Sequence, residues 1–213
     1  MKLVIFGAAG KAGGRIAKEA LRRGHRVIAG VRHREQLKDI PAGAEGVLGD
    51  PTSPASVHEL APGTDAFVVA IGAADSSIWR RAAETLAQVL PTIPGAPRVV
   101  HMGGGSSLLA PDGKLVLDSP DFPATWRPTA TRQAEALDFY RSLALSSLNW
   151  SYVSPPPIHF APGERTGQYR TGEDHPVVDG RGESRISYED FAVAVVDEIE
   201  RPRFARRRFT VGY

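Results

Sequence analysis

A glycine-rich segment near the start of the chain has the spacing of a phosphate-binding loop. Gly7, Gly10 and Gly13 recur at every third position, directly after the apolar residues 3–6. In such a loop the first glycine permits a tight turn, the second lets the backbone approach a pyrophosphate, and the third lets a helix pack against a strand. N–H groups at the start of that helix bind the phosphate oxygens. The predicted dinucleotide contacts are Gly7, Ala9, Gly10, Lys11, Ala12 and Gly13.

The residues that follow the second predicted strand, residues 26–31, indicate which of the two nicotinamide dinucleotides binds. An NAD site usually has a carboxylate there, which binds the ribose 2′-hydroxyl. This chain has Val31-Arg32-His33-Arg34 instead, and a guanidinium can form a bidentate pair with a 2′-phosphate. We therefore expect NADPH rather than NADH, with Arg32 on the 2′-phosphate and Lys11 as a second cation.

Three further strand ends are expected to contribute to the same site. Asp50 follows the third predicted strand, residues 46–48, and is placed to reach the adenine amino group. The fourth predicted strand, residues 66–70, ends in the small residues 70–73, which suit a backbone that runs beside a ribose. We expect cofactor contacts from these strand ends at Asp50, Ala70, Ile71, Gly72, Met102 and Gly103.

The elements that must position these residues alternate between strands and helices. Apolar runs predict strands over residues 3–6, 26–31, 46–48, 66–70 and 98–102. Helical periodicity predicts helices over residues 12–23, 52–60 and 77–90. Strands separated by helices of this length imply parallel βαβ units with right-handed crossovers. The fold class is therefore α/β, a Rossmann-like doubly wound parallel sheet with its ligand at the carboxyl ends of the strands.

The second half of the chain is less regular. We expect a helix over 131–145, a sixth strand over 150–153, an irregular hairpin region over 162–179 and a final helix over 187–199. No interdomain linker is evident, so we expect a single domain over 1–213. A small irregular C-terminal substrate-side lobe is expected to come mainly from residues 103–128 and 155–186.

Composition excludes several classes of protein. The chain has 213 residues, a formal net charge of +2 and no cysteine, which excludes disulfides, thiolate zinc sites and cysteine nucleophiles. The charge balance gives no reason to expect nucleic acid, and the six histidines show no metal-binding spacing. No apolar run is long enough for a membrane span, so we expect no membrane partner and a cytoplasmic location. The arginines that crowd the last thirteen residues are interpreted as a solvated strand edge rather than a binding patch.

The chain resembles the atypical short-chain dehydrogenase/reductase family, specifically its NADH-flavin reductases, which are related to biliverdin reductase B and more distantly to NmrA-like proteins. The resemblance extends over essentially the whole chain. Its motifs are residues 7–13, 48–50, 103–108, 119–123, 153–155, 162–169 (Pro-Gly-Glu-Arg-Thr-Gly-Gln-Tyr) and 185–190 (Arg-Ile-Ser-Tyr-Glu-Asp). It implies NAD(P)H-dependent reduction of a flavin, quinone or similar planar acceptor.

The catalytic motif of the typical short-chain dehydrogenases is broken in this chain. Tyr140 is followed four residues later by Ala144, where those enzymes have a lysine, so Tyr140 is expected to pack. A conjugated acceptor spreads the charge that a hydride delivers, and positioning can then supply most of the rate. We expect polar assistance from Ser106 and Ser107, with a weaker case for His159.

Three aromatic residues, Phe122, Trp126 and Phe160, could stack on a planar acceptor, although packing roles are expected for them. Two other functions stay open. One is a non-enzymatic redox sensor of the NmrA type, which binds the dinucleotide and reports to a partner. The other is an epimerase or dehydratase that acts on a specific metabolite. The sequence is compatible with a monomer or a homodimer.

Overall fold

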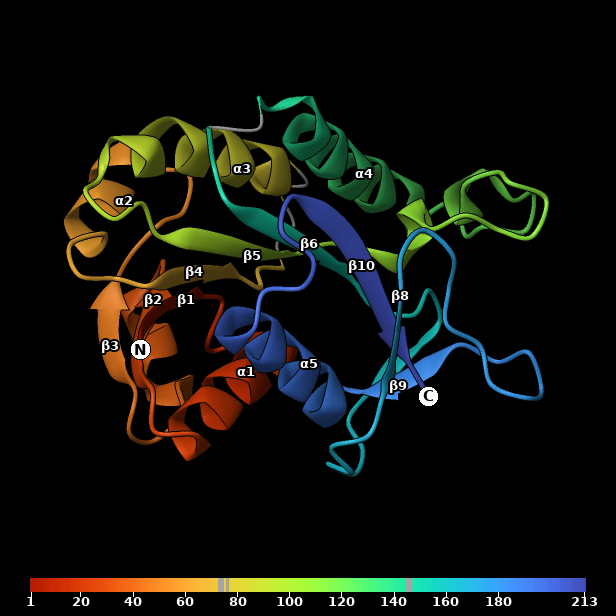
Figure 1. The fold of residues 1–213 in the computed structure, drawn as a ribbon, viewed down its shortest axis with the longest axis horizontal. Coiled ribbons are helices and arrows are strands. Elements are labelled where there is room, and N and C mark those ends of the chain that lie inside the picture. The colour runs from red at the N-terminus through yellow and green to blue at the C-terminus, as the bar shows by residue number, and fades with distance from the viewer. Residues whose placement is uncertain (73–74, 76, 145–146) are drawn as a thin grey trace.

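Parallel strands joined by helices build one large sheet from nearly the whole chain (Figure 1). The computed structural model describes residues 1–72, 75, 77–144 and 147–213. The main sheet has eight strands in the order β3-β2-β1-β4-β5-β6-β10-β8, and the only antiparallel neighbours described in it are β10 and β8. The strand order reverses between β1 and β4, which makes the carboxyl ends of these two strands the topological switch point. The doubly wound α/β fold predicted from the sequence is confirmed.

The main sheet contains β1 (Lys2–Phe6), β2 (Arg26–Val31), β3 (Glu45–Leu48), β4 (Ala66–Val69), β5 (Arg98–Met102), β6 (Trp150–Ser154), β8 (Arg170–Gly172) and β10 (Arg207–Gly212). A separate parallel pair is formed by β7 (His159–Ala161) and β9 (Arg185–Ser187). The α-helices are α1 (Lys11–Arg22), α2 (Pro54–Leu60), α3 (Ile78–Val89), α4 (Arg127–Ser142) and α5 (Tyr188–Glu200). Four 3₁₀ turns are described, η1 (Arg34–Asp39), η2 (Leu90–Thr92), η3 (Gly105–Ser107) and η4 (Val116–Asp118).

Both faces of the sheet are covered by helices, which explains why β1 is apolar and buried from Leu3 to Phe6. Successive side chains of a strand point to opposite faces. Leu3 and Ile5 accordingly pack in the core on the side of α1 and α5. Val4 and Phe6 pack in the core on the side of α2, α3 and α4. Figure 1 shows these two helical layers on either side of the sheet.

The second half of the chain departs from the sequence predictions in its pairing. The region 162–179 does not form a hairpin, because β8 within it pairs with the C-terminal strand β10 and the preceding β7 pairs with β9. Both partners are distant in the sequence, so local turn signals could not reveal them. Helix α4 begins at Arg127, before the predicted start at 131. The predicted helix end at 145 lies outside the described residues.

The prediction of a solvated strand edge is wrong for one of the C-terminal arginines. Arg207 is exposed, but the side chain of Arg208 is only 2% exposed. Strand β10 lies between β6 and β8 rather than at the margin of the sheet. The guanidinium of Arg208 therefore needs hydrogen-bond partners inside the protein.

A buried carboxylate connects α1 with the segment that precedes β8. Glu19 on α1 is 4% exposed and receives hydrogen bonds from Arg22, Arg23 and Arg165. Arg23 also pairs with Asp197 of α5 at 2.6 Å. Burial alone would raise the pKa of Glu19, but the hydrogen bonds from the three arginines hold it far below its ordinary value of 4.5.

The depressed pKa of Glu19 predicts a specific loss of stability in acid. The contribution of a carboxylate with a lowered native pKa is complete above its unfolded pKa and is lost as the pH falls toward the native pKa. We therefore expect the difference in unfolding free energy between wild type and Glu19→Gln to be largest above about pH 5 and to shrink steadily toward about pH 2. Urea unfolding across this range measures it, with the exposed Glu59→Gln as control. A difference that is independent of pH would contradict the expectation.

Candidate active site

The turn between β1 and α1 contains approaches that only glycine permits. Gly7 has φ +88°, in the left-handed region, and a Cβ on it would lie 2.3 Å from the carbonyl oxygen of Ala70. A Cβ on Gly13 would lie 2.1 Å from the carbonyl oxygen of Gly7. Gly10 is the N-cap of α1 and provides no side chain to bond the first helical turn. The first turn of α1 therefore lies at the carboxyl end of β1 without a side-chain cap, and N–H groups at such a helix start can bind an anion.

A cavity of about 130 Å³ lies beside this turn, at the carboxyl ends of β1, β2 and β4. It brings together the predicted residues Gly7, Ala9, Gly10, Arg32, Ala70, Ile71 and Gly72. The remaining lining residues are Phe6, Gly30, Val31, Gln36, Gly49 and Pro51. The strand ends that the sequence marked separately therefore meet in space at the switch point. Residue 73, the last of the predicted small residues, lies outside the described part of the chain.

Arg32 and Gln36 form the polar wall of this cavity. Arg32 follows β2 directly and is exposed, so its guanidinium has room to meet a ligand. Gln36 belongs to η1, and its Oε1 accepts a hydrogen bond from the backbone N–H of His33 at 3.1 Å. Arg34 also lies in η1 but is not among the lining residues. Gln36 was missed by sequence reasoning because nothing in its surroundings predicted this turn.

Four of the predicted cofactor residues lie near the cavity without lining it. Lys11, Ala12 and Gly13 form the first turn of α1, with Lys11 exposed. Asp50 stands between the lining residues Gly49 and Pro51. Its Oδ1 accepts hydrogen bonds from the backbone N–H and the hydroxyl of Thr52, each at 2.8 Å. One oxygen of this carboxylate therefore stabilises the local turn.

A second cavity, of about 340 Å³, opens at the carboxyl ends of β5 and β6. Of the predicted residues, Met102, Gly103 and Ser106 line it. Its other walls come from the segment after β5, from the first turns of α4 and the residues before it, from the segment after β6 and from β7. These residues are Gly104, Gly105, Phe122, Thr125, Trp126, Thr129, Ala130, Gln133, Pro155, Pro156, Pro157 and Phe160.

The floor of this second cavity is fixed by a tyrosine ring beneath a glycine. A Cβ on Gly103 would lie 2.0 Å from ring atoms of Tyr152, so the backbone lies directly on that ring. The Tyr152 hydroxyl donates to the carbonyl oxygen of Gln133 at 2.7 Å. Burial raises the pKa of Tyr152 above its range in water. Tyr152 is thus a neutral support and has no exposed surface from which to transfer a proton.

The two predicted serines have different surroundings. Ser106 lines the second cavity. Ser107 is 3% exposed, and its hydroxyl donates to the carbonyl oxygen of Gly104 at 3.2 Å while accepting from Nη1 of Arg208 at 3.3 Å. The structure therefore places only Ser106 at a cavity wall and engages Ser107 in holding the turn.

Aromatic rings border the second cavity on two sides. Phe122 and Trp126 pack edge to face with ring centroids 6.5 Å apart. Trp126 is 56% exposed, whereas the other two tryptophans of the chain are each 3% exposed. Phe160, on the opposite side, packs on Tyr188 and Phe191. An exposed indole at a cavity wall offers a flat surface for stacking.

Tyr140 lies in the core rather than in either of these cavities. It is 1% exposed, stacks on Trp150 and has its hydroxyl 3.0 Å from Nδ1 of His101. Burial raises the pKa of Tyr140 well above its ordinary value and lowers that of His101 to about 3. Both groups are therefore uncharged at neutral pH. The packing role predicted for Tyr140 is confirmed.

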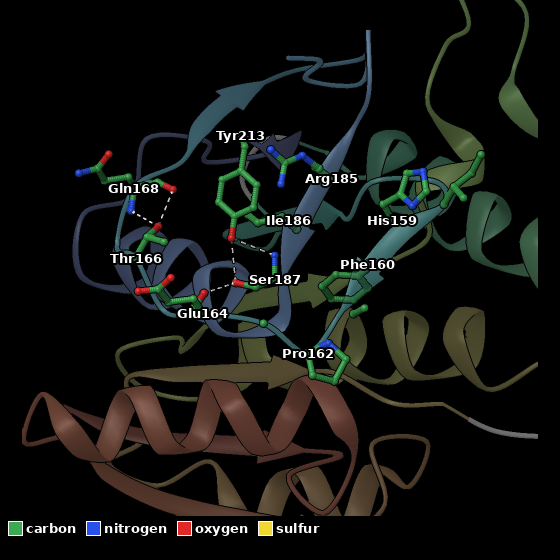
Figure 2. Close-up of a pocket in the computed structure, with 13 residues that line it drawn as sticks. His159, Phe160, Pro162, Glu164, Thr166, Gln168, Arg185, Ile186, Ser187 and Tyr213 are labelled. Carbon is green, nitrogen blue, oxygen red and sulfur yellow. Dashed lines mark hydrogen bonds between the residues drawn. The ribbon is translucent and has the colours of Figure 1, made fainter. Parts of the chain in front are cut away.

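A third cavity, of about 640 Å³, lies along β7 and β9 (Figure 2). The Tyr213 hydroxyl donates to Oγ of Ser187 at 2.9 Å, and Ser187 Oγ is 2.8 Å from the carbonyl oxygen of Glu164. His159 lines this cavity and not the second one (Figure 2). Phe160 lines both, so the second and third cavities adjoin at this residue.

Two features are absent from the described residues. Within 1–72, 75, 77–144 and 147–213, no group of three or more His, Cys, Asp or Glu side chains is arranged to hold a metal ion. No helix in the same part of the chain has both the length and the apolar character to cross a membrane.

Comparisons with known proteins agree with this geometry. The uncharacterized protein YwnB of Bacillus subtilis is 36% identical over 99% of this chain and 98% of its own length. A crystal structure from Streptococcus pneumoniae, of a protein proposed to be an NADH-flavin reductase, is 31% identical with a TM-score of 0.85, covering 100% of this chain and 99% of the other. A protein of Bacteroides thetaiotaomicron proposed to be an epimerase is 33% identical with a TM-score of 0.85, covering 100% and 96%.

The family comparison extends over most of the chain. The model of the NAD(P)H-binding family matches residues 7–202, a span that begins at the first glycine of the turn. It includes every residue that lines the second cavity and all but Phe6 of those that line the first. This match confirms the family resemblance drawn from the sequence. The chain is therefore a member of the NAD(P)H-binding family, with an oxidoreductase-like Rossmann fold.

Proposed function

We propose that the protein is an NADPH-dependent reductase that transfers hydride to a flavin, a quinone or a similar planar acceptor. The observation that carries the proposal is the arrangement of two cavities along one edge of the sheet. The first lies at β1, β2 and β4 and has the phosphate-binding turn. The second lies at β5 and β6, with glycines, an exposed tryptophan and a serine in its walls. A dinucleotide extended along this edge would bring its nicotinamide from the first cavity toward the second.

The residues of the first cavity fit NADPH in their donor chemistry. The turn and the first-turn N–H groups of α1 would hold the pyrophosphate, and Arg32 would bind the 2′-phosphate. Lys11 adds positive charge at the start of the same helix. NADPH supplies the hydride. The role of these residues is to bind and orient the dinucleotide.

The second cavity supports the acceptor side of the proposal. Trp126 and Phe122 would stack on the acceptor, and Ser106 would donate a hydrogen bond to an acceptor carbonyl or to the nicotinamide amide. A conjugated acceptor takes up its proton from solvent, so no general acid is needed in the cavity. This agrees with the burial of Tyr140 away from it. Positioning and exclusion of water then supply the rate acceleration.

Removing the guanidinium at position 32 tests the cofactor assignment. Arg32→Ala is expected to weaken NADPH binding by about 1–3 kcal/mol, or roughly 5- to 150-fold, and to leave NADH binding nearly unchanged. Titration calorimetry with both dinucleotides measures the effect. Arg34→Ala, which removes a neighbouring arginine outside the cavity, is the matched control. Equal losses for NADPH and NADH in Arg32→Ala would contradict the 2′-phosphate assignment.

The activity itself is tested by following NADPH consumption with FMN, riboflavin and a simple quinone. Acceptor-dependent loss of NADPH, faster than the loss of NADH, is the result expected of the reductase. Tight binding of NADPH and NADP⁺ with no turnover on any acceptor would favour a redox sensor. Turnover of a sugar or similar metabolite without net NADPH consumption would instead favour an epimerase.

A further inference from the structure

A buried arginine lies beneath the segment that carries Ser106. Arg208 is the second residue of β10 and pairs in register with Tyr152 of β6, the residue that supports Gly103. The side chain of Arg208 is 2% exposed. Its Nη1 donates to the carbonyl oxygen of Ser107 at 3.0 Å and to the Ser107 hydroxyl at 3.3 Å. Arg208 therefore binds the residue adjacent to Ser106 through both backbone and side chain.

The other side of the guanidinium is bound by a carboxylate on the loop between β8 and β9. Nε of Arg208 donates to Oδ1 of Asp174 at 2.9 Å, and Nη2 donates to the same oxygen. The carbonyl oxygen of Asp174 accepts a hydrogen bond from the backbone N–H of Leu109 at 2.8 Å. Asp174 thus binds Arg208 through its carboxylate and Leu109, at the end of the segment that carries Ser106, through its backbone carbonyl. Arg141 of α4 reaches Asp174 from outside at 2.8 Å, without a described contact to Ser107.

These contacts enclose the short segment 103–109 from below and from its end. The backbone N–H of Gly103 bonds to Val153 at one end, and Leu109 bonds to Asp174 at the other. Between them, Arg208 holds Ser107, and Ser107 holds Gly104. The cavity side of the segment presents Ser106. The support comes from β6, from β10 and from the loop after β8, and none of these hydrogen bonds uses the side chain of Ser106.

The burial of a guanidinium is not explained by stability alone. The free-energy cost of desolvating a charge often exceeds the energy gained from its ion pair, and an apolar side chain would stabilise the fold as well. An arginine differs from an apolar residue in its planar set of donors, which fixes the direction of each partner. Here those donors fix the carboxylate of Asp174 and the backbone carbonyl of Ser107, the residue next to Ser106 in the wall of the second cavity. The buried arginine therefore serves to fix the geometry of this segment rather than to stabilise the fold.

We propose that Arg208, anchored by Asp174, is a positioning residue that holds Ser106 in place for the acceptor. The inference rests on the proposed function, since it assigns Ser106 a task in acceptor reduction. Arg208 itself touches neither cofactor nor acceptor. Its effect must therefore depend on Ser106 and be confined to the acceptor side of the reaction.

A double-mutant cycle tests this dependence. Arg208→Met is expected to lower kcat/KM for the acceptor by about 10- to 100-fold, the effect of a small displacement of a reacting group. Its dissociation constant for NADPH should stay within about twofold of wild type. In a Ser106→Ala background the same substitution should lower kcat/KM by less than about threefold, because the group that it positions is already absent. Arg208→Lys, which keeps the charge but not the planar donors, replaces Arg208→Met if that variant does not fold.

Arg141→Gln is the matched control, since it removes an arginine from the same Asp174 oxygen without touching Ser107. It is expected to leave kcat/KM within about twofold of wild type. Equal proportional losses from Arg208→Met with and without Ser106 would overturn the proposal. So would unchanged kcat/KM in a variant whose only defect is a lower Tm.

Hydrogen exchange separates this proposal from the proposed function. Amides of residues 103–109 should exchange faster in Arg208→Met than in wild type or Arg141→Gln, while amides of residues 7–13 exchange as before. If wild-type protein reduces none of the acceptors, the proposed function fails, and the exchange experiment still decides whether Arg208 holds this segment. Unchanged exchange over 103–109 would refute the positioning role in either case.

Discussion

Replacement of Gly13 by alanine is expected to abolish tight NADPH binding. The new Cβ would lie 2.1 Å from the carbonyl oxygen and 2.7 Å from the carbonyl carbon of Gly7, so α1 must move away from the turn. Backbone atoms cannot evade the clash by a change of rotamer. We expect at least a 100-fold rise in the dissociation constant, about 3 kcal/mol, and a loss of unfolding free energy of about 3 kcal/mol, the upper part of the range for overpacking.

Calorimetric titration with NADPH and urea unfolding of the same variant measure the two effects. Gly180→Ala is the matched control, because a Cβ there meets nothing within 4 Å and the backbone is not left-handed. It should change NADPH affinity and stability very little, by less than about 0.5 kcal/mol. NADPH binding of wild-type strength in Gly13→Ala would show that the dinucleotide does not use this turn.

The second large effect is expected at a buried ion pair between β5 and α5. Glu198 is 2% exposed and lies 3.0 Å from Nη2 of Arg98, which is 7% exposed. Its carboxylate also accepts hydrogen bonds from Oγ of Ser151 at 2.7 Å and from the backbone N–H of Arg203 at 2.9 Å. Glu198→Ala leaves a buried guanidinium and several donors without a partner. We expect a loss of about 3–5 kcal/mol of unfolding free energy, and a fall in Tm of roughly 10 °C.

An exposed ion pair in the same molecule is the control for the buried pair of Glu198 and Arg98. Glu45 pairs with Arg26 at 2.8 Å, but both side chains are more than half exposed. Glu45→Ala should therefore change the unfolding free energy by less than about 1 kcal/mol, as solvent screens such a pair. Denaturant unfolding of both variants provides the comparison. A loss below about 1 kcal/mol in Glu198→Ala would mean that the pair around Arg98 contributes little to stability.

The first half of the fold could be predicted from the sequence because its signals are local. Apolar runs mark strands that are buried on both faces, and Gly7 and Gly13 mark the turn where a helix meets the sheet. The rule that ligands bind at the carboxyl ends of parallel strands then brought Arg32, Ala70 and Gly72 into one predicted site. The first cavity assembles those residues.

What sequence reasoning missed depends on contacts between distant residues. The pairings of β8 with β10 and of β7 with β9 involve partners for which no local signal exists. Gln36 lines the first cavity because it lies in a 3₁₀ turn, and no sequence motif predicts that turn. Ser106 and Ser107 are adjacent serines, and the sequence does not distinguish them. In the fold Ser107 binds Gly104 and Arg208, whereas Ser106 lines the second cavity.

The central claim, hydride transfer from NADPH to a planar acceptor, is tested most directly by a single turnover without oxygen. Protein saturated with NADPH is mixed with a limiting amount of FMN, and the absorbance of each partner is followed in time. We predict loss of NADPH and of oxidised flavin in equal amounts, at a rate that saturates with protein concentration and is at least tenfold slower in Gly13→Ala. Full occupancy by NADPH with no loss of either absorbance would contradict the claim and leave a dinucleotide-binding protein that does not reduce flavin.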